Sequence, residues 1–404
     1  MHYECIFVHF WLYICVMIER NISAKVKSLA RKFPVVTITG PRQSGKSTLI
    51  KNLFPKKPYI SLEDPDMRRL AIEDPRGFLN NYPNGAILDE VQNIPSLFSY
   101  IQGIVDHKNK SGMYILSGSQ NFLLMEKITQ TLAGRTAICQ LLPLSKSELE
   151  QSGIKTSDIN TLIYKGFYPR LYDKRISPTD FYSSYLKTYI ERDVRQIRNI
   201  TDHSLFLKFL KMCAARIGSV LNIQSLANDC GVSLNTAKSW LSVLETGYII
   251  NLLQPYHNNF NKRLMKSPKL YFYDTGLVCH LLGISNSKDI AHHYLRGGLF
   301  ENLVIADTLK FYHNQAKQPP IYYWKDKTQK EIDLIIDKGN DKLLAIEIKA
   351  GETMTKDYFA NFSYWNKITL SKPEKNMVVY AGEKQFQTVS GLYVPFNVYE
   401  NIIK

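Results

Sequence analysis

The stretch Val35-Val-Thr-Ile-Thr-Gly-Pro-Arg-Gln-Ser-Gly-Lys-Ser-Thr-Leu49 decides the fold of the first part of this chain. A β-branched run ends at Gly40 and Lys46-Ser47 open a predicted helix, so the stretch matches G-x-x-x-x-G-K-[ST] at every fixed position. The two glycines permit the positive φ angles that a loop around a polyanion needs, and successive N–H groups then point inward. The pattern predicts a loop that binds ATP, with Lys46 on the β- and γ-phosphates and Ser47 as a ligand of Mg²⁺. The residues assigned to the nucleotide are Gly40, Pro41, Arg42, Gln43, Ser44, Gly45, Lys46, Ser47 and Thr48.

Length and composition indicate a globular protein of several domains. The chain has 404 residues, which exceeds the size at which a single core stops growing, and 45% of them are hydrophobic. The net charge of +15 makes nucleic acid, and double-stranded DNA in particular, the first partner to consider, although a nucleotide-binding protein can be basic for other reasons. The six cysteines are scattered, without zinc spacing, so we expect free thiols and a cytoplasmic location.

The first residues are apolar from Cys5 to Ile18, apart from His9. This run is shorter than the roughly 20 residues that span a bilayer, and neither a basic segment before it nor a cleavage site after it indicates a signal peptide. We expect no stable membrane insertion, and we favour Met17 as the natural start, with residues 1–16 as an extension.

An alternation of strands and helices from Val35 to about Ser147 predicts a parallel sheet covered on both faces, with the charged segment 66–80 as one of the helices. The strand before Asp89-Glu90 ends in two acids, which is the pattern of a Walker B motif: Asp89 would hold Mg²⁺ through water, and Glu90 would orient and deprotonate the attacking water. The alternative is an acidic strand end that caps the next helix.

Two further segments of this region carry candidate site residues. Another strand ends in Ser117-Gly-Ser-Gln120, so Ser117, Ser119 or Gln120 could sense the γ-phosphate, or the segment could simply cap a helix. Arg135 is placed to reach the phosphates of a neighbouring subunit, which would require a homo-oligomer, or to pair with an acid.

Four motifs together resemble prokaryotic AAA-superfamily ATPases that carry a C-terminal domain of unknown function: Gly40–Ser47, Leu88–Gln92, Leu116–Gln120 and Leu132–Arg135. The resemblance continues through Gly166-Phe-Tyr-Pro169 and Tyr189-Ile-Glu-Arg-Asp193 and covers nearly the whole chain from Met17. It implies an AAA-type ATPase fold and agrees with a start at Met17. It does not imply a biological role.

The sequence of the middle of the chain predicts a mainly helical region. Residues 177–200 indicate a long helix in which Ser177 is the N-cap and a tyrosine stripe (Tyr182, Tyr185, Tyr189) packs in the core, with Arg192 and Arg195 beyond it. Residues 205–273 indicate three helices and two strands, a winged-helix pattern whose third helix begins after Ser233. That helix would expose Asn235, Thr236, Lys238 and Ser239, and the loop between the strands carries Lys262, Arg263 and Lys266. The unit either binds DNA or joins two proteins.

The C-terminal third carries a second group of charged residues. Asp333 lies on one predicted strand, and Glu347 and Lys349 lie on the same face of the next. With Glu301 from the preceding helix, they resemble the PD-(D/E)xK nuclease fold, in which the acids would bind Mg²⁺ and the lysine would steady the attacking water. Ile332 in place of proline and the nearby Glu331 depart from the pattern, and the same charges can serve DNA binding alone.

The predicted fold class is α/β, with a P-loop AAA-type parallel sheet, a winged helix-turn-helix and a restriction-endonuclease-like α/β domain. The predicted domains are an ATPase core (17–150), a helical lid (151–204), the winged helix (205–275) and the nuclease-like domain (276–404). We expect an ATP hydrolase coupled to DNA binding or processing, with a second, nuclease activity left open. The alternative is a nucleotide-gated signalling or scaffold protein whose nuclease-like domain is inert.

Overall fold

The computed structural model describes residues 18–119, 130–189, 202–256, 267–326, 328–340, 342–369 and 376–404. Several predictions concern residues outside these ranges, namely the N-terminal extension 1–16, the start at Met17, Gln120, Arg192, Arg195 and the basic loop residues Lys262, Arg263 and Lys266. None of the helices in the described ranges combines the length and the hydropathy that crossing a bilayer requires.

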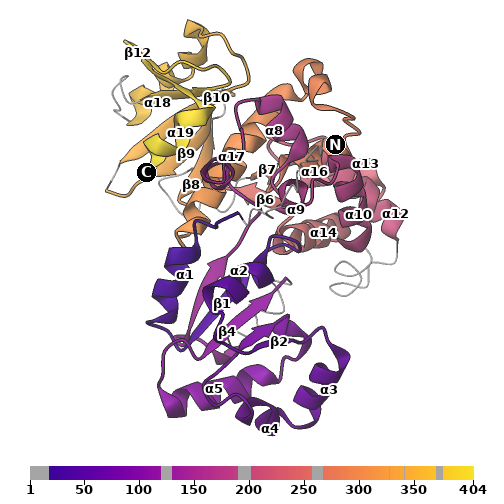
Figure 1. Cartoon of the computed structure of the whole chain (residues 1–404). Helices are drawn as coiled ribbons and strands as arrows, with labels where there is room; N and C mark the ends of the chain where they lie inside the picture. Colours follow the sequence, from indigo (N-terminus) through magenta and orange to yellow (C-terminus); the bar gives the residue numbers. More distant parts are fainter. Residues whose placement is uncertain are drawn as a thin grey trace, which may run out of the picture.

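The N-terminal part is a parallel sheet between two layers of helices, and it forms the lower lobe in Figure 1. In the described part of the chain this sheet has five strands in the order β2-β3-β4-β1-β5. The strands are β1 (Val35–Thr39), β2 (Tyr59–Ser61), β3 (Ile87–Asp89), β4 (Tyr114–Gly118) and β5 (Thr136–Gln140). Strand β4 therefore lies between the P-loop strand β1 and the acidic strand β3, and parallel pairing brings the carboxyl ends of all three to one edge.

Two sets of helices cover the faces of this sheet. Helices α1 (Ser23–Ala30) and α2 (Lys46–Leu53) pack on one face, and α3 (Pro65–Glu73), α4 (Pro75–Asn80) and α5 (Leu97–Lys108) pack on the other; the short 3-10 helix η1 (Val91–Asn93) follows β3. The prediction of one helix over 66–80 was wrong, because the chain breaks at Asp74-Pro75. Pro75 has no N–H to continue α3, and the Asp74 side chain accepts from Gly77 N (2.9 Å) as the N-cap of α4.

A mainly helical region follows the parallel sheet. It begins with α7 (Lys146–Gln151), α8 (Ile159–Lys165), α9 (Arg170–Asp173) and α10 (Pro178–Tyr189). The tyrosine stripe of α10 is buried, as predicted for core packing, and Ser177 Oγ accepts from Asp180 N (3.1 Å) at its start. The region continues with α12 (His203–Ala214), α13 (Ile223–Cys230) and α14 (Leu234–Thr246), then the antiparallel pair β6 (Ile250–Leu253) and β7 (Lys269–Phe272), then α16 (Thr275–Leu281) and the 3-10 helix η3 (Ser287–His292).

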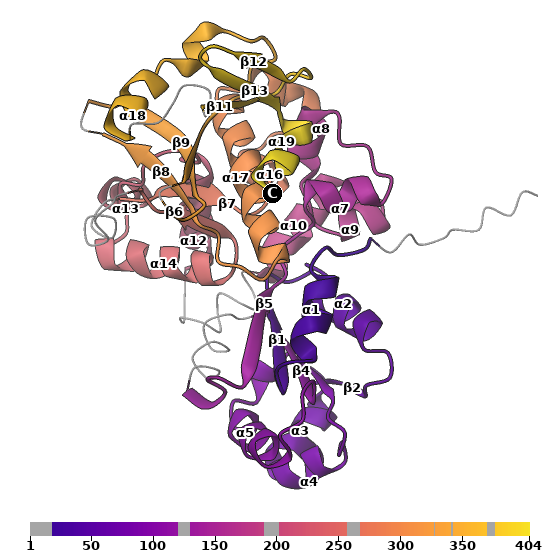
Figure 2. The same ribbon diagram turned by 90° about the vertical axis from the view of Figure 1, so that its left-hand side faces the viewer.

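The C-terminal part is a mixed sheet packed on a long helix. Helix α17 (Arg296–Asn314) lies between this sheet and the helical region (Figure 2). In the described residues the sheet has the order β12-β13-β11-β10-β9-β8, and β10, β11 and β13 run parallel. After α17, the strands and helices of the C-terminal part are, in chain order, β8 (Ile321–Lys325), β9 (Glu331–Asp337), β10 (Leu343–Lys349), η4 (Lys356–Phe359), α18 (Phe362–Thr369), β11 (Met377–Tyr380), β12 (Phe386–Thr388), β13 (Gly391–Pro395) and α19 (Phe396–Ile403).

One hydrophobic cluster runs from Leu142 to Ile403 and joins the helical region, α17 and one face of the C-terminal sheet. The two faces of the N-terminal sheet have separate clusters. The four cysteines in the described ranges, Cys139, Cys213, Cys230 and Cys279, are buried and free. Because burial of apolar surface is the main stabilising term, the helical region and the C-terminal sheet are expected to fold together, while the N-terminal sheet has its own core.

Candidate functional site

The loop between β1 and α2 has the backbone conformation that its glycines allow. Gly40 and Gly45 have φ values of 148° and 93°, and Gln43 also has a positive φ of 62°. A Cβ atom on Gly40 would lie 2.1 Å from the carbonyl oxygen of Leu141, so no other residue fits there without moving that backbone. The first turn of α2 follows directly, and its N–H groups face the loop.

Lys46 lies over the loop that it is predicted to serve. Its Nζ donates to the carbonyl oxygens of Gly40 and Pro41, both at 2.9 Å, and the side chain is only 6% exposed. The ammonium group is thus held at the first two residues of the loop. The Oγ of Ser44 is buried nearby without a hydrogen-bond partner among the described residues. An unsatisfied buried hydroxyl costs about 1–3 kcal/mol, so a polar ligand at this loop fits the residues present.

Asp89 lies at the carboxyl end of β3 and accepts three hydroxyl groups. Ser47 Oγ donates at 2.6 Å and Tyr59 OH at 2.5 Å, both to Oδ2, while Ser117 Oγ donates to Oδ1. Burial, and then the hydrogen bond to Asp89, raise the pKa of Tyr59 well above its ordinary value, so this phenol stays a donor. The two predicted magnesium ligands, Ser47 and Asp89, are thus in direct contact, and hard oxygen atoms are the ligands that Mg²⁺ prefers.

Glu90 follows with a left-handed backbone, φ 55°, which turns its side chain toward the end of β4. Its Oε2 accepts from Ser119 Oγ (3.0 Å) and from Gln92 Nε2. The carboxyl end of β4 and the residue after it, predicted to sense phosphate or to cap a helix, therefore hold both acids: Ser117 in β4 donates to Asp89, and Ser119 donates to Glu90.

Arg20, which the sequence did not single out, lies behind the P-loop. Its guanidinium donates to the carbonyl oxygens of Ser44 and Leu142, both at 2.7 Å, and pairs with Glu148 at 3.1 Å. Arg20 is 7% exposed and Glu148 is fully buried. The pair fixes the outer side of the loop to α7. No local pattern marks Arg20, because its three partners come from distant parts of the chain.

The remaining predicted site residues do not all lie at this centre. Arg42 pairs with Glu63 (3.6 Å), and Thr48 is exposed on α2. Arg135 lies at the amino end of β5, beside Val35, and so at the opposite edge of the sheet from Gly40. It forms a bidentate pair with Asp106 at 2.5 and 2.9 Å, the alternative that the sequence left open for this chain. From that edge it faces away from its own P-loop, so a role on phosphate would need a second copy.

The second charged group is at β9 and β10 in the C-terminal sheet. Lys349 pairs with Asp333 (3.4 Å) and with Glu347, while Ile348 N donates to Asp333 at 2.8 Å. Asn361 donates to Glu347 at 3.1 Å. The predicted neighbours thus lie together, and Glu347 is only 1% exposed. Burial, and then the charge of Asp333, raise the pKa of Glu347 to about 8.

Glu301 joins this group through a residue that the sequence did not single out. Lys269 of β7, 1% exposed, pairs with Glu301 (2.9 Å), Glu331 and Asp333 (3.8 Å). Tyr271 donates to Glu301 at 2.5 Å, and burial raises the pKa of that carboxyl to about 7. We call Lys269, Glu301, Glu331, Asp333, Glu347 and Lys349 the acidic cluster. Within the described residues, no group of three or more His, Cys, Asp or Glu side chains is arranged to hold a metal ion.

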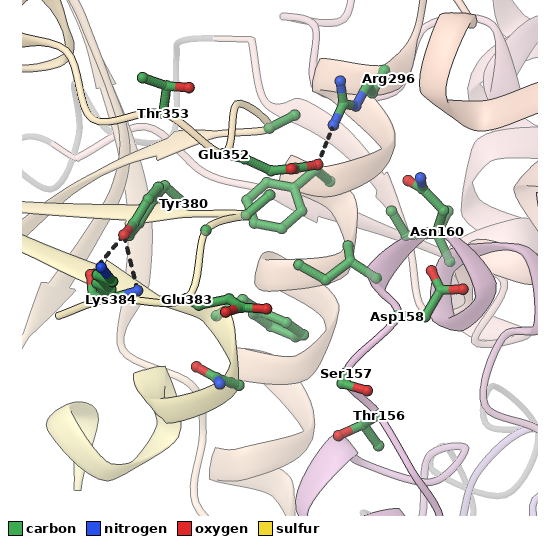
Figure 3. A pocket seen from close by; sticks show the side chains of 18 of the residues that line it. Thr156, Ser157, Asp158, Asn160, Arg296, Glu352, Thr353, Tyr380, Glu383 and Lys384 are labelled. Atoms are coloured by element: carbon green, nitrogen blue, oxygen red, sulfur yellow. Dashed lines mark hydrogen bonds and ion pairs between the residues drawn. The ribbon is translucent and has the colours of Figure 1, made fainter. Parts of the chain in front are cut away.

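A cavity of about 930 Å³ lies at the carboxyl ends of β10, β11 and β13, against the loop before α8 (Figure 3). Charges of both signs line it, and Arg296 and Glu352 pair across one side at 3.4 Å. Asp158 and Lys384 lie on opposite walls in Figure 3. Mixed charges of this kind favour no one class of ligand.

The comparisons with known proteins follow the same division of the chain. Residues 32–150 match the family described as an AAA domain. Residues 156–288 match a domain of unknown function (DUF8612), and residues 296–399 match another (DUF4143).

Two uncharacterized proteins, of Mycobacterium bovis and Mycobacterium tuberculosis, are each 28% identical to this chain over 378 residues, which cover 92% of this chain and 82% of theirs. A Walker-type ATPase of Pyrococcus abyssi aligns with 66% of this chain and 96% of its own, at 13% identity and a TM-score of 0.45. The family match over residues 32–150 and the geometry of the loop between β1 and α2 identify the N-terminal part. Residues 32–150 form an AAA-type P-loop domain.

Proposed function

We propose that this protein binds ATP with Mg²⁺ at the P-loop and hydrolyses it. The observation that carries this proposal is the contact of Ser47 Oγ with Asp89 Oδ2 at 2.6 Å beside a glycine-framed loop. Two oxygen ligands that meet in this way suit one hard cation at the start of α2. When bound, magnesium would supply Lewis-acid stabilisation of the phosphate oxygens.

The chain's own residues then have separate tasks. The loop N–H groups from Gly40 to Ser47 bind the phosphates, and Lys46 exchanges its two carbonyl partners for phosphate oxygens. Glu90 orients the attacking water and takes its proton. The hydrogen bonds to Glu90 from Gln92 Nε2 and from the backbone N–H and Oγ of Ser119 all go to Oε2, so we assign the proton transfer to Oε1.

The test measures binding of a fluorescent ATP analogue and phosphate release with Mg²⁺. We expect Lys46→Ala to lose most of the binding, and Lys27→Ala, an exposed lysine of α1 in the same lobe, to behave as wild type. No nucleotide binding by the wild-type protein would overturn the proposal.

We further propose that hydrolysis is coupled to DNA through the unit of α12, α13, α14, β6 and β7. Its three helices and the antiparallel strand pair after them follow the order expected of a winged helix. Ser233 Oγ accepts from Thr236 N (3.0 Å) at the start of α14, Asn235 and Lys238 are exposed, and Trp240 is buried. The net charge of +15 also favours a polyanion.

This coupling is tested by the affinity for a double-stranded DNA fragment at several salt concentrations, with and without ATP. We expect a steep fall of affinity with salt and a weaker affinity in Lys238→Ala. Salt-insensitive or absent binding would instead favour a joint between proteins.

A specific observation favours the alternative for the C-terminal domain, a scaffold without nuclease activity. The ammonium groups of Lys269 and Lys349 already lie among the carboxylates where a metal ion would have to bind. The cluster then holds β7 against the C-terminal sheet. Nicking of supercoiled plasmid in Mg²⁺ by wild type but not by Lys349→Ala would instead support a PD-(D/E)xK nuclease with Glu301, Asp333 and Glu347 as metal ligands.

A further inference from the structure

The end of the P-loop strand contacts the turn that follows helix α14. Thr39 Oγ1 and Tyr248 OH form a hydrogen bond of 2.7 Å across 209 residues of sequence. Thr39 is fully buried and Tyr248 is 3% exposed, so water does not compete for this bond. Thr39 is the last residue of β1, and the next residue, Gly40, provides one of the carbonyl oxygens that hold Lys46.

Tyr248 is firmly attached to the helix that carries the exposed polar face. It lies between the end of α14 and the start of β6, and its φ of 57° makes the chain turn there. Its N–H donates to Glu245 O (3.1 Å), and the next N–H donates from Ile249 to Leu244 O (2.9 Å). Its ring meets the edge of Tyr273, just after β7, with 6.2 Å between ring centroids. The backbone that carries the phenol is therefore hydrogen-bonded to the last turn of α14, and its ring packs at the end of β7.

We propose that Tyr248 is a positioning residue that couples the conformation of the P-loop to the placement of α14. This inference rests on the proposed ATP binding, because the movement begins when Lys46 leaves the carbonyl oxygens of Gly40 and Pro41 for phosphate. A shift of Gly40 changes the position of the Thr39 hydroxyl, and the buried bond transfers that change to Tyr248. Because binding free energies are reciprocal, whatever binds the exposed face of α14 would alter the affinity for nucleotide by the same factor.

The experiment is amide hydrogen exchange of the full chain, with and without an ATP analogue and Mg²⁺, read on residues 234–253. In wild type we expect nucleotide to change the exchange rates there severalfold. In Tyr248→Phe and in Thr39→Val this response disappears while nucleotide still binds. The double variant resembles either single one, since both remove the same bond.

Tyr273→Phe is the matched control, because it removes the hydroxyl of the neighbouring ring, which lies 3.4 Å from Asn251 Nδ2. It keeps the wild-type response. A normal response in Tyr248→Phe, or an equal loss in Tyr273→Phe, overturns the coupling. Nucleotide that binds wild type without any change in residues 234–253 also overturns it and leaves the proposed function standing, whereas no binding at all removes both.

Discussion

Two groups of buried carboxylates in this chain differ in the donors that surround them. At the P-loop, the donors to the Asp89 carboxylate among the described residues are the neutral hydroxyl groups of Ser47, Tyr59 and Ser117. In the acidic cluster, the carboxylates accept from the ammonium groups of Lys269 and Lys349. Neutral donors leave the negative charge of Asp89 in place, so a divalent cation is attracted, while two lysines have partly neutralised the second group. Carboxylates in the expected positions are therefore a weaker indication of a metal site than the net negative charge that remains once their donors are counted.

We expect the strongest loss of activity from a substitution at the P-loop site, at Glu90. Glu90→Gln keeps the shape of the side chain and its contact with Ser119, but an amide cannot accept the proton of water. We expect turnover to fall by about 10²–10⁴-fold with little change in nucleotide affinity. Steady-state phosphate release and analogue binding, measured on the same preparation, check this. Unchanged turnover would remove Glu90 as the base.

The second-largest expected effect is a loss of protein stability when the acidic cluster is disrupted. Lys269→Met keeps the length of the side chain and leaves Glu301, Glu331 and Asp333 without their shared ammonium group. Breaking a buried ion pair typically costs about 3–5 kcal/mol of unfolding free energy. Urea unfolding measures the loss. Lys325→Met, which removes a more exposed partner of Glu331 at 2.9 Å, is the control, and an equal loss in both variants would contradict the buried role of Lys269.

A smaller effect is expected on the pH dependence of protein stability, through Glu347. Burial and Asp333 raise the pKa of Glu347 from 4.5 to about 8, so the folded protein holds this proton more tightly than the unfolded chain. The contribution of this proton to the free energy of unfolding is therefore lost as pH rises from about 5 to about 8. Glu347→Gln cannot titrate, so its unfolding midpoint should fall less over this range than that of wild type. Parallel pH curves for the two proteins would show that Glu347 is ionised throughout.

The smallest effect on stability is expected at an exposed pair, which sharpens the contrast with both buried groups. Asp106→Asn removes the partner of Arg135 at the surface, where solvent screens the charges. We expect no measurable shift of the unfolding midpoint.

Arg135→Ala should lower turnover only at protein concentrations at which copies associate, as phosphate release against concentration would show. Wild-type turnover of Arg135→Ala at every concentration would exclude a role in a second copy's site.

The residues that short-range patterns predicted are those whose partners are near in sequence or set by strand order. The P-loop glycines, the cap at Ser233 and the buried tyrosine stripe of α10 follow from local conformation and periodicity. The prediction of one helix over 66–80 was wrong at Asp74-Pro75. The missing N–H of Pro75 ends the first helix there, although the charged composition favours a continuous helix.

Local sequence patterns were enough to predict that a phosphate loop and an acidic strand end meet at one edge of a parallel sheet, because both lie at the carboxyl ends of their strands. Only the tertiary structure placed Arg20 behind the loop, Tyr248 against Thr39 and Lys269 among the acids. Each of these contacts joins residues that are far apart in the chain. Such partners are selected by packing of whole elements against one another, which leaves no spacing that a sequence pattern can detect.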